Sequence, residues 1–419
     1  MSTLEENLIN DNEEFSSKKR IASIDFVKGL ALGVIIWAHA ALSWFDNDWR
    51  YIYGFLFSFL DFLGPSLFVF LSALSVIFSI KRKKIASSDK TIRNRIFTRG
   101  LVIIMIGVLF NPISLFIENK SLPFPANLWG WNILMFIGFS QIFSYYALKF
   151  SKITRAITGF VVIFISPWIR QILFQFKDIN AGVNILHFII TSPLPQVPFL
   201  PWIAVCFIST IFGEYLFETM MKGTKEAYFR LLRIFLTCGV VLVLTGLFIW
   251  IPRLGLDQWE PGWAILNPTS TGGTIVSAEY LHINLLELMN NNVINYQFPG
   301  MALFTIRSSG HNMFFNLGAA LLIIGISFYY IDIKNKQNIF IKMLIFFGKV
   351  SLSLFLIQYL FLPLYLGQFP IIFAPFVFAA YSGFLGLLMY IWQKFFNGIG
   401  SPEWMMSTLG SRGKKKNNT

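Results

Sequence analysis

Long apolar runs, separated by short polar segments, make up most of this 419-residue chain. About ten of these runs have the length of roughly 20 residues at which a helix crosses the hydrocarbon core of a bilayer. The run over 53–80 exceeds one bilayer thickness, so we expect it to tilt or to kink at Pro65. The predicted spans cover 21–44, 53–80, 96–117, 131–150, 153–174, 197–217, 231–251, 313–331, 341–366 and 371–395.

The basic residues predict how these spans are oriented. Lysine and arginine gather in every second connection, and the connections between are poor in both. Short cytoplasmic loops carry an excess of lysine and arginine, so this alternation puts both termini on the cytoplasmic side and requires an even number of spans. The sequence therefore predicts an all-α fold, a polytopic membrane helix bundle of about ten transmembrane helices, N-in and C-in.

A single membrane domain with two tails is the predicted domain organisation. A cytoplasmic N-terminal tail covers 1–19, the transmembrane domain covers 20–397, and a basic cytoplasmic tail covers 398–419. The fourth outer connection, 252–312, is long and rich in turn-forming residues, so we expect it to cap the bundle. Within it, the pattern of apolar positions predicts a short amphipathic helix at 279–289.

Composition favours a membrane protein over a nucleic-acid-binding protein. Hydrophobic residues make up 55% of the chain and charged residues 13%, about half the charged share of a typical soluble domain. The net charge of +13 lies mostly in loops between spans, so we expect the lipid bilayer as a partner and no nucleic acid. A homodimer is compatible with the sequence. Cys206 and Cys238 both fall inside predicted spans, where a small core residue is favoured over a disulfide.

Two ionisable residues lie inside predicted membrane spans, where the surrounding hydrocarbon disfavours a charge. His39 is on the first predicted span and Asp61 on the second. An ionisable group costs roughly 2.5–3.5 kcal/mol at the bilayer centre and is a functional candidate for that reason. The two spans form an antiparallel hairpin, so both side chains fall in the outer half, where a carboxylate would orient the imidazole as a general base. The alternatives are a structural histidine and an aspartate in a helix-packing hydrogen bond.

Four other residues are candidates for binding a substrate from the outer side. His311 and Asn312 begin the eighth predicted span, and Trp259 and His282 lie in the long connection. Trp259 and its acidic neighbours have the composition of a sugar-stacking surface, although an interfacial aromatic belt and solvated loop histidines explain the same residues. The HExxH, Walker, GxSxG and CxxC motifs of soluble enzymes are absent from the sequence, and we expect no metal site.

Several segments resemble membrane acyltransferases, in the same order along the chain. The segment Arg20–Gly29, followed by His39, is similar to an opening R-x-x-S-x-D-x-x-(R/K)-G signature with a histidine further along the helix. That signature is shared by the acyltransferase 3 family and the heparan-α-glucosaminide N-acetyltransferase-like family. Further resemblances lie at 61–72, 131–138, 198–202, 347–354 and 400–404.

This resemblance implies transfer of an acyl group, usually acetyl from acetyl-CoA, to the hydroxyl or amine of a glycan or glycolipid. His39 matches the histidine taken to be catalytic in the acyltransferase 3 family. Arg93 and Arg95 match a basic pair that serves the CoA side, and Arg99 continues the same basic run. In this hypothesis acetyl-CoA binds from the cytoplasm, and His39, oriented by Asp61, deprotonates the acceptor or carries the acyl group.

Two departures from these families leave other functions open. The first outer loop, 45–52, has no histidine, whereas the glucosaminide enzymes place their catalytic histidine there. Gln358 stands near the position where the late element usually continues to a histidine. A transporter or flippase would use His39 and Asp61 as a proton relay, and a catalytically inactive relative is the third alternative. Binding of acetyl-CoA from the cytoplasmic face discriminates the enzyme from the transporter.

Overall fold

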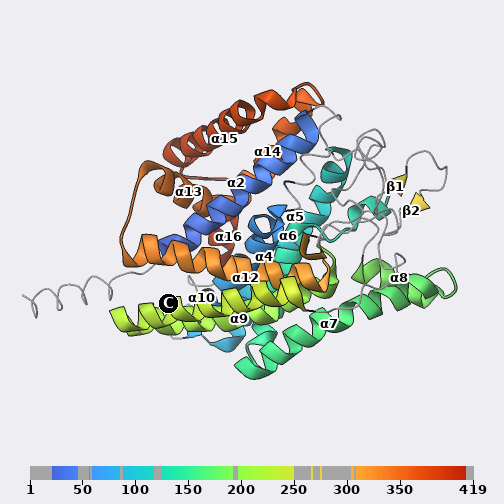
Figure 1. Ribbon diagram of the computed structural model, residues 1–419. Helices are drawn as coiled ribbons and strands as arrows, with labels where there is room; N and C mark the ends of the chain where they lie inside the picture. Colours follow the sequence, from blue (N-terminus) through green and yellow to red (C-terminus); the bar gives the residue numbers. More distant parts are fainter. Residues whose placement is uncertain are drawn as a thin grey trace, which may run out of the picture.

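The protein is a bundle of helices, most of them long and apolar (Figure 1). The computed structural model describes residues 21–45, 56, 59–84, 88–117, 124–191, 197–249, 266–267, 274–275, 303–305 and 308–411. Two short strands, β1 (Leu266–Asn267) and β2 (Thr274–Ile275), pair antiparallel with Leu266 opposite Ile275. The predicted polytopic helix bundle is confirmed.

Most of the α-helices overlap the predicted apolar runs, whereas α8 and α16 lie outside them. Their bounds are α2 Ala22–Trp44, α4 Pro65–Lys84, α5 Asp89–Ile117, α6 Ile133–Ala147, α7 Lys152–Phe176, α8 Ala181–Ile190, α9 Phe199–Lys222, α10 Lys225–Phe248, α12 Gly310–Ser327, α13 Ile339–Lys349, α14 Ser351–Phe361, α15 Ala374–Phe396 and α16 Pro402–Ser411. Short 3-10 turns are η2 Asp61–Leu63, η3 Ala126–Leu128, η5 Leu303–Thr305, η7 Leu362–Tyr365 and η8 Ile371–Phe373, and η6 Phe328–Ile333 is a π-helix that continues α12.

The number of membrane spans depends on how the shorter helices are counted. Among the described residues, seven helices are long and apolar enough to cross a membrane, or eight if the bent pair α13–α14 forms one span. Helix α6 and the apolar part of α4 are shorter. The count of about ten, and the cytoplasmic location of both termini, therefore stay predictions.

Polar residues directly before several helices set where those helices begin. The Ser151 side chain accepts a hydrogen bond from Thr154 N at the start of α7, and Ser309 does the same for Asn312 N at the start of α12. These N-caps satisfy backbone N–H groups that have no partner within the helix. Each cap comes directly before an apolar run, so these helices begin within a few residues of the predicted starts.

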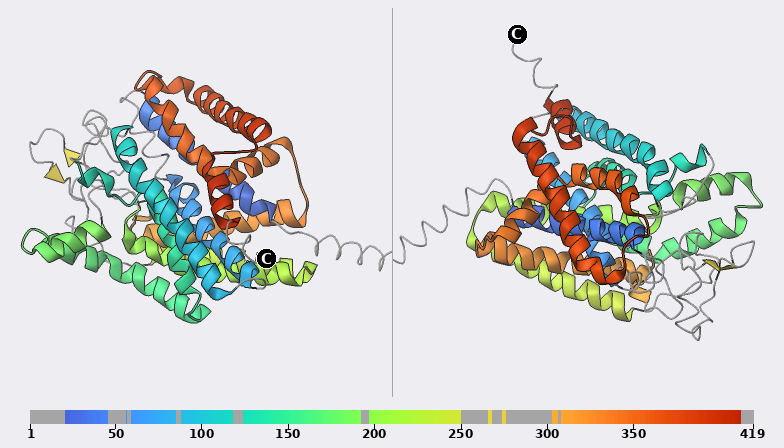
Figure 2. Two further views of the ribbon diagram at one scale, coloured as in Figure 1. Left: turned by 180° about the vertical axis from the view of Figure 1, so that it is seen from behind. Right: turned by 90° about the horizontal axis from the view of Figure 1, so that it is seen from above.

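Helices α2, α9 and α12 form the centre of the bundle. Their apolar windows are 61%, 72% and 67% buried within the protein, whereas those of α7 and α15 are 28% and 17% buried. Helix α12 packs against α10 and α2, while α9 packs against α7 and α4 (Figures 1 and 2). Polar side chains on the central helices are therefore held inside the bundle, and the peripheral helices expose apolar surface suited to lipid.

Helices α2 and α13 cross at two glycines. A Cβ atom added at Gly29 would lie 1.9 Å from Leu344 O, and one added at Gly348 would lie 1.8 Å from Asp25 O. Only residues without a side chain allow the two backbones to come this close. Gly33, four residues after Gly29, has nothing within 4 Å of such a Cβ, so only the first glycine of this GxxxG step makes a close helix contact.

The predicted ninth span is not one straight helix. It is broken at Val350 into α13 and α14, which are bent by 88° relative to each other. Glu403 from the terminal helix α16 accepts hydrogen bonds from Leu352 N at 2.8 Å and Ser353 N at 3.0 Å, which caps the start of α14. Together with the backbone contact at Gly348, this cap stabilises a break within a run that was predicted as one span.

Helix α8, which packs against α7, lies in a connection for which no helix was predicted. Asn180 caps it through Gly182 N and Val183 N. The helix predicted at 279–289 lies outside the described residues.

Candidate functional site

His39 lies on α2 in the half of the helix farther from the basic N-terminal segment. It is about 25 Å along the helix axis from Ala22, at about 1.5 Å per residue. The side chain is neither fully buried nor fully exposed. Its Nε2 atom is 3.1 Å from the Tyr359 hydroxyl on α14, and the two rings pack edge to face at 4.9 Å. This hydrogen-bond contact therefore joins the His39 imidazole to another helix, α14.

Tyr359 is itself firmly held. The residue is 4% exposed, and its ring packs edge to face against Phe110 of α5 at 4.5 Å. A phenol hydroxyl both donates and accepts, so it can bond Nε2 in either imidazole tautomer. Tyr359 thus restrains the rotation of the His39 ring without fixing which nitrogen carries the proton.

The C-terminal part of α14 and the η7 turn that follows it are docked on α15 and α2 by two further hydrogen bonds. Trp44 Nε1 donates to Leu362 O at 2.7 Å, and the Tyr381 hydroxyl donates to Gln358 O at 2.6 Å. The Trp44 and Tyr381 rings are 4.4 Å apart. These contacts fix the rotation of α14 about its own axis and so hold Tyr359 against His39.

Asp61 lies in the 3-10 turn η2, directly before the break at Gly64 and the start of α4 at Pro65. The predicted kink at Pro65 is therefore confirmed, and Asp61 lies at the break. Its Oδ2 atom accepts a hydrogen bond from Asn316 Nδ2 of α12 at 2.9 Å. The residue is 3% exposed, so a carboxylate at this position depends on such contacts.

Asn316 is the centre of a buried polar network. Besides Asp61, its Nδ2 atom lies 2.8 Å from Ser66 Oγ and 3.1 Å from Asn312 Oδ1. An amide nitrogen has two hydrogens, so three acceptors use its donating capacity completely. The network brings together Asp61 and Asn312, which were predicted separately as a catalytic and a substrate-binding residue.

His311 and Asn312 make contacts that anchor the start of α12. Asn312 Nδ2 donates to Phe304 O at 2.8 Å, and its Oδ1 accepts from Ser308 N at 3.3 Å. His311 Nε2 lies 2.9 Å from Ile249 O, and a carbonyl only accepts, so Nε2 carries the proton. Both residues are buried. These contacts are structural, and a role in substrate binding stays a prediction.

Other predicted site residues lie elsewhere or outside the described part. Trp259 and His282 lie outside the described residues. The pairing of His39 with Asp61 stays a prediction, since their described hydrogen bonds run to α14 and α12 respectively. However, η2 packs against α2, so the two residues belong to neighbouring elements.

The three predicted CoA-side arginines lie in the first part of α5. Arg93 and Arg99 are exposed and Arg95 is half-exposed. The Arg99 guanidinium is desolvated by the protein around it, and Glu403 is close enough to act on it electrostatically. Arg93 and Arg95 are thus the residues of this group that are accessible to a ligand that bears phosphates, as the predicted role requires.

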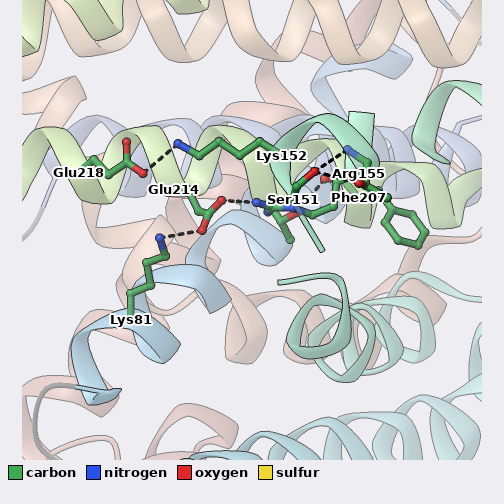
Figure 3. A network of polar contacts seen from close by, with 9 residues as sticks. Lys81, Ser151, Lys152, Arg155, Phe207, Glu214 and Glu218 are labelled. Carbon is green, nitrogen blue, oxygen red and sulfur yellow. Dashed lines mark hydrogen bonds and ion pairs between the residues drawn. The ribbon is translucent and has the colours of Figure 1, made fainter. Parts of the chain in front are cut away.

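A second polar centre joins the ends of three helices (Figure 3). Glu214 of α9 forms ion pairs with Lys81 of α4, at 2.7 Å, and with Arg155 of α7. The Arg155 side chain is 2% exposed and that of Glu214 10%. Lys152 and Glu218 form a neighbouring, more exposed pair at 2.8 Å. Through its two ion pairs, Glu214 clamps α9 to α4 and α7. This clamp lies at the end of the bundle that the charge pattern predicts to be cytoplasmic.

Sequence reasoning did not identify Tyr359, Asn316 or Glu214 as members of these centres. Asn316 and Glu214 carry a usable signal, because each is a polar residue within an apolar helix. The four-residue spacing of Asn312 and Asn316 also predicts that they share a helix face. A tyrosine in an apolar helix carries no such signal, so Tyr359 emerges only from the packing of α14 on α2.

A comparison with known families adds an independent finding. The family model described as heparan-alpha-glucosaminide N-acetyltransferase, catalytic, matches residues 20–249, more than half of the chain. The matched part includes His39, Asp61 and the three arginines of α5, whereas Asn316 and Tyr359 follow it. Among curated proteins, none matches the chain.

Proposed function

The chain belongs to the family of heparan-alpha-glucosaminide N-acetyltransferase catalytic domains, and from this membership we propose that it is an integral membrane acetyltransferase acting on glycans. The observation that carries the proposal is the match over residues 20–249, which includes the helix that bears His39. The geometry supports it, because His39 is an ionisable side chain on a central helix, restrained by Tyr359. Such a group is a functional candidate wherever it occurs in a membrane helix.

The donor in this proposal is acetyl-CoA, bound from the cytoplasmic side. When bound, it supplies an activated acetyl group as a thioester. Arg93, Arg95 and Arg99 would hold its phosphates, since guanidinium groups are suited to phosphate and the side chains of Arg93 and Arg95 are at least partly exposed. The acceptor would be the hydroxyl or amine of a glycan or glycolipid head group that enters from the outer side.

His39 is proposed as the general base that takes the proton of the acceptor. A hydrogen bond to Tyr359 keeps the imidazole in one orientation while it gains and loses that proton. Asp61, held by Asn316 in the turn that packs on α2, supplies a negative charge that favours the imidazolium form during transfer. Its role is electrostatic and does not require direct contact with the imidazole.

Acetyl transfer by the purified protein in liposomes tests the proposal. Acetyl-CoA labelled in the acetyl group is supplied together with amino sugars or glycolipids, and labelled product is measured. We expect transfer by the wild-type protein and a loss of at least a hundredfold for His39→Ala. Undiminished transfer by His39→Ala would remove His39 from the mechanism. Movement of unmodified acceptor across the membrane, with no acetylated product, would identify a transporter instead.

A further inference from the structure

Gln358 on α14 is a buried amide that the contacts described above do not explain. The residue is 0% exposed. In the part of the chain that the structure describes, neither its Nε2 nor its Oε1 atom has a hydrogen-bond partner. Burying an amide donor and acceptor without partners is costly, so such a group persists where a ligand or a water molecule satisfies it.

The position of Gln358 on α14 makes it a neighbour of two residues that contact His39. Gln358 follows Phe355 by three residues and Tyr359 follows it by four, so each of the two is a neighbour of Phe355 on the helix surface. Phe355 and Tyr359 pack their rings against His39, at 6.2 and 4.9 Å between centroids. The backbone of the same turn is held by the hydrogen bond from Tyr381 to Gln358 O. The unsatisfied amide therefore belongs to the turn of α14 whose two aromatic residues contact the proposed base.

We propose that Gln358 is a catalytic residue whose Nε2–H donates a hydrogen bond to the carbonyl oxygen of the acetyl group being transferred. The inference rests on the proposed acetyltransferase function. As the acceptor nitrogen or oxygen bonds to the carbonyl carbon, negative charge develops on the carbonyl oxygen, and Gln358 stabilises it. The acceptor proton passes to His39, the bond between carbon and sulfur breaks, and His39 returns the proton to the leaving thiolate.

A comparison with Asn316 shows why Gln358 is suited to this role. The Asn316 amide nitrogen already has three acceptors within 3.1 Å, so it has no hydrogen left for a substrate. The Gln358 nitrogen has both hydrogens available and is held on a turn that is anchored to α15. A donor that is already in place before the reaction does not have to reorient when charge develops on the carbonyl oxygen. This absence of reorganisation energy is the basis of oxyanion stabilisation.

The test compares two unreactive analogues of acetyl-CoA for binding to the purified full-length protein. One is the ketone in which a methylene group replaces the thioester sulfur, and the other is S-ethyl-CoA, which has no carbonyl. We expect the wild-type protein to bind the ketone about three- to tenfold more tightly than S-ethyl-CoA, the value of one hydrogen bond. Gln358→Met should bind the two equally and lose about 10²–10³-fold in kcat.

Gln141→Met is the matched control, because Gln141 is a buried glutamine on a different helix, α6. It should keep the wild-type preference for the ketone. Gln358→Met should unfold at or above the wild-type temperature, because the amide that it removes has no partner, and Gln358→Leu gives a second variant of the same kind.

Two results would overturn the assignment while the proposed function stands: equal binding of the two analogues by the wild-type protein, or a preference that survives in both Gln358 variants. Failure of the wild-type protein to bind either analogue would overturn the proposed function and this inference together.

Discussion

The ion pair between Arg155 and Glu214 provides a quantitative test of how the bundle is held together. Replacing Glu214 with leucine removes the carboxylate that lies between Arg155 and Lys81. The Arg155 side chain is 2% exposed, so water cannot take the place of that carboxylate. An uncompensated buried charge of this kind costs about 3–5 kcal/mol, so Glu214→Leu should destabilise the bundle strongly.

The order of the variants follows from the same contacts. Arg155→Met should cost about 1–2 kcal/mol, because Glu214 keeps its pair with Lys81 at 2.7 Å. The double variant should be more stable than Glu214→Leu alone, since it no longer buries an unpaired guanidinium. Lys152→Met is the control on the same helix. In its ion pair with Glu218, the Lys152 side chain is 32% exposed and the Glu218 side chain 45%. An exposed ion pair contributes about 0.2–1 kcal/mol to stability.

Cys206 provides the assay. It lies on α9, the helix of Glu214, and is 1% exposed, so a thiol-reactive dye reaches it only when the bundle opens. In a Cys238→Ala background, the labelling rate reports the population of the open state. A loss of 3–5 kcal/mol corresponds to labelling that is about a hundredfold to several thousandfold faster for Glu214→Leu.

Two outcomes would refute this reasoning. The first is a Glu214→Leu protein that labels at the rate of Lys152→Met. The second is a double variant that is no more stable than Glu214→Leu. Either result would mean that Arg155 finds water or another partner, and that the clamp does not stabilise the contact of α4, α7 and α9.

Three further predictions follow from contacts that join distant helices. Gly29→Ala should lower the unfolding temperature strongly, because its Cβ would lie 1.9 Å from a backbone carbonyl of α13, whereas Gly33→Ala should leave that temperature unchanged. Asn316→Leu should cost about 2–4 kcal/mol in chemical unfolding, because it leaves the buried Asp61 carboxylate without this donor; a loss below 1 kcal/mol would contradict the network. Glu403→Gln should speed hydrogen exchange at the first amides of α14 about fivefold, since a carboxylate cap contributes roughly 1 kcal/mol; unchanged exchange would argue against this cap.

Much of the fold could be predicted because most helices follow from the local pattern of apolar residues. The apolar runs, which follow from the bilayer thickness, predicted helices such as α2 and α7 to within a few residues. The break at Val350 was not predicted in this way, because 341–366 is apolar overall, and Gly348, Lys349 and Ser351 beside the break do not by themselves end a membrane span. That break is stabilised by Glu403 and by the contact of Gly348 with α2, and both depend on residues far away in the sequence.

The candidate site was predictable only in part, for a similar reason. The cost of an ionisable group in hydrocarbon identified His39 and Asp61, since that cost depends on one residue and its depth. The partners of these residues, Tyr359 and Asn316, depend on how α14 and α12 are rotated against their neighbours. Helix rotation is decided by tertiary packing, which a single sequence does not reveal.

The central claim is that His39 transfers the acceptor proton, and the single-turnover rate of acetyl transfer tests it most directly. His39→Gln keeps a polar side chain of similar size, and His187→Gln serves as control, because His187 is a buried histidine on α8. The account predicts a rate lower by about 10²–10⁴-fold for His39→Gln and within about twofold of wild type for His187→Gln. Equal rates for the two variants would contradict it.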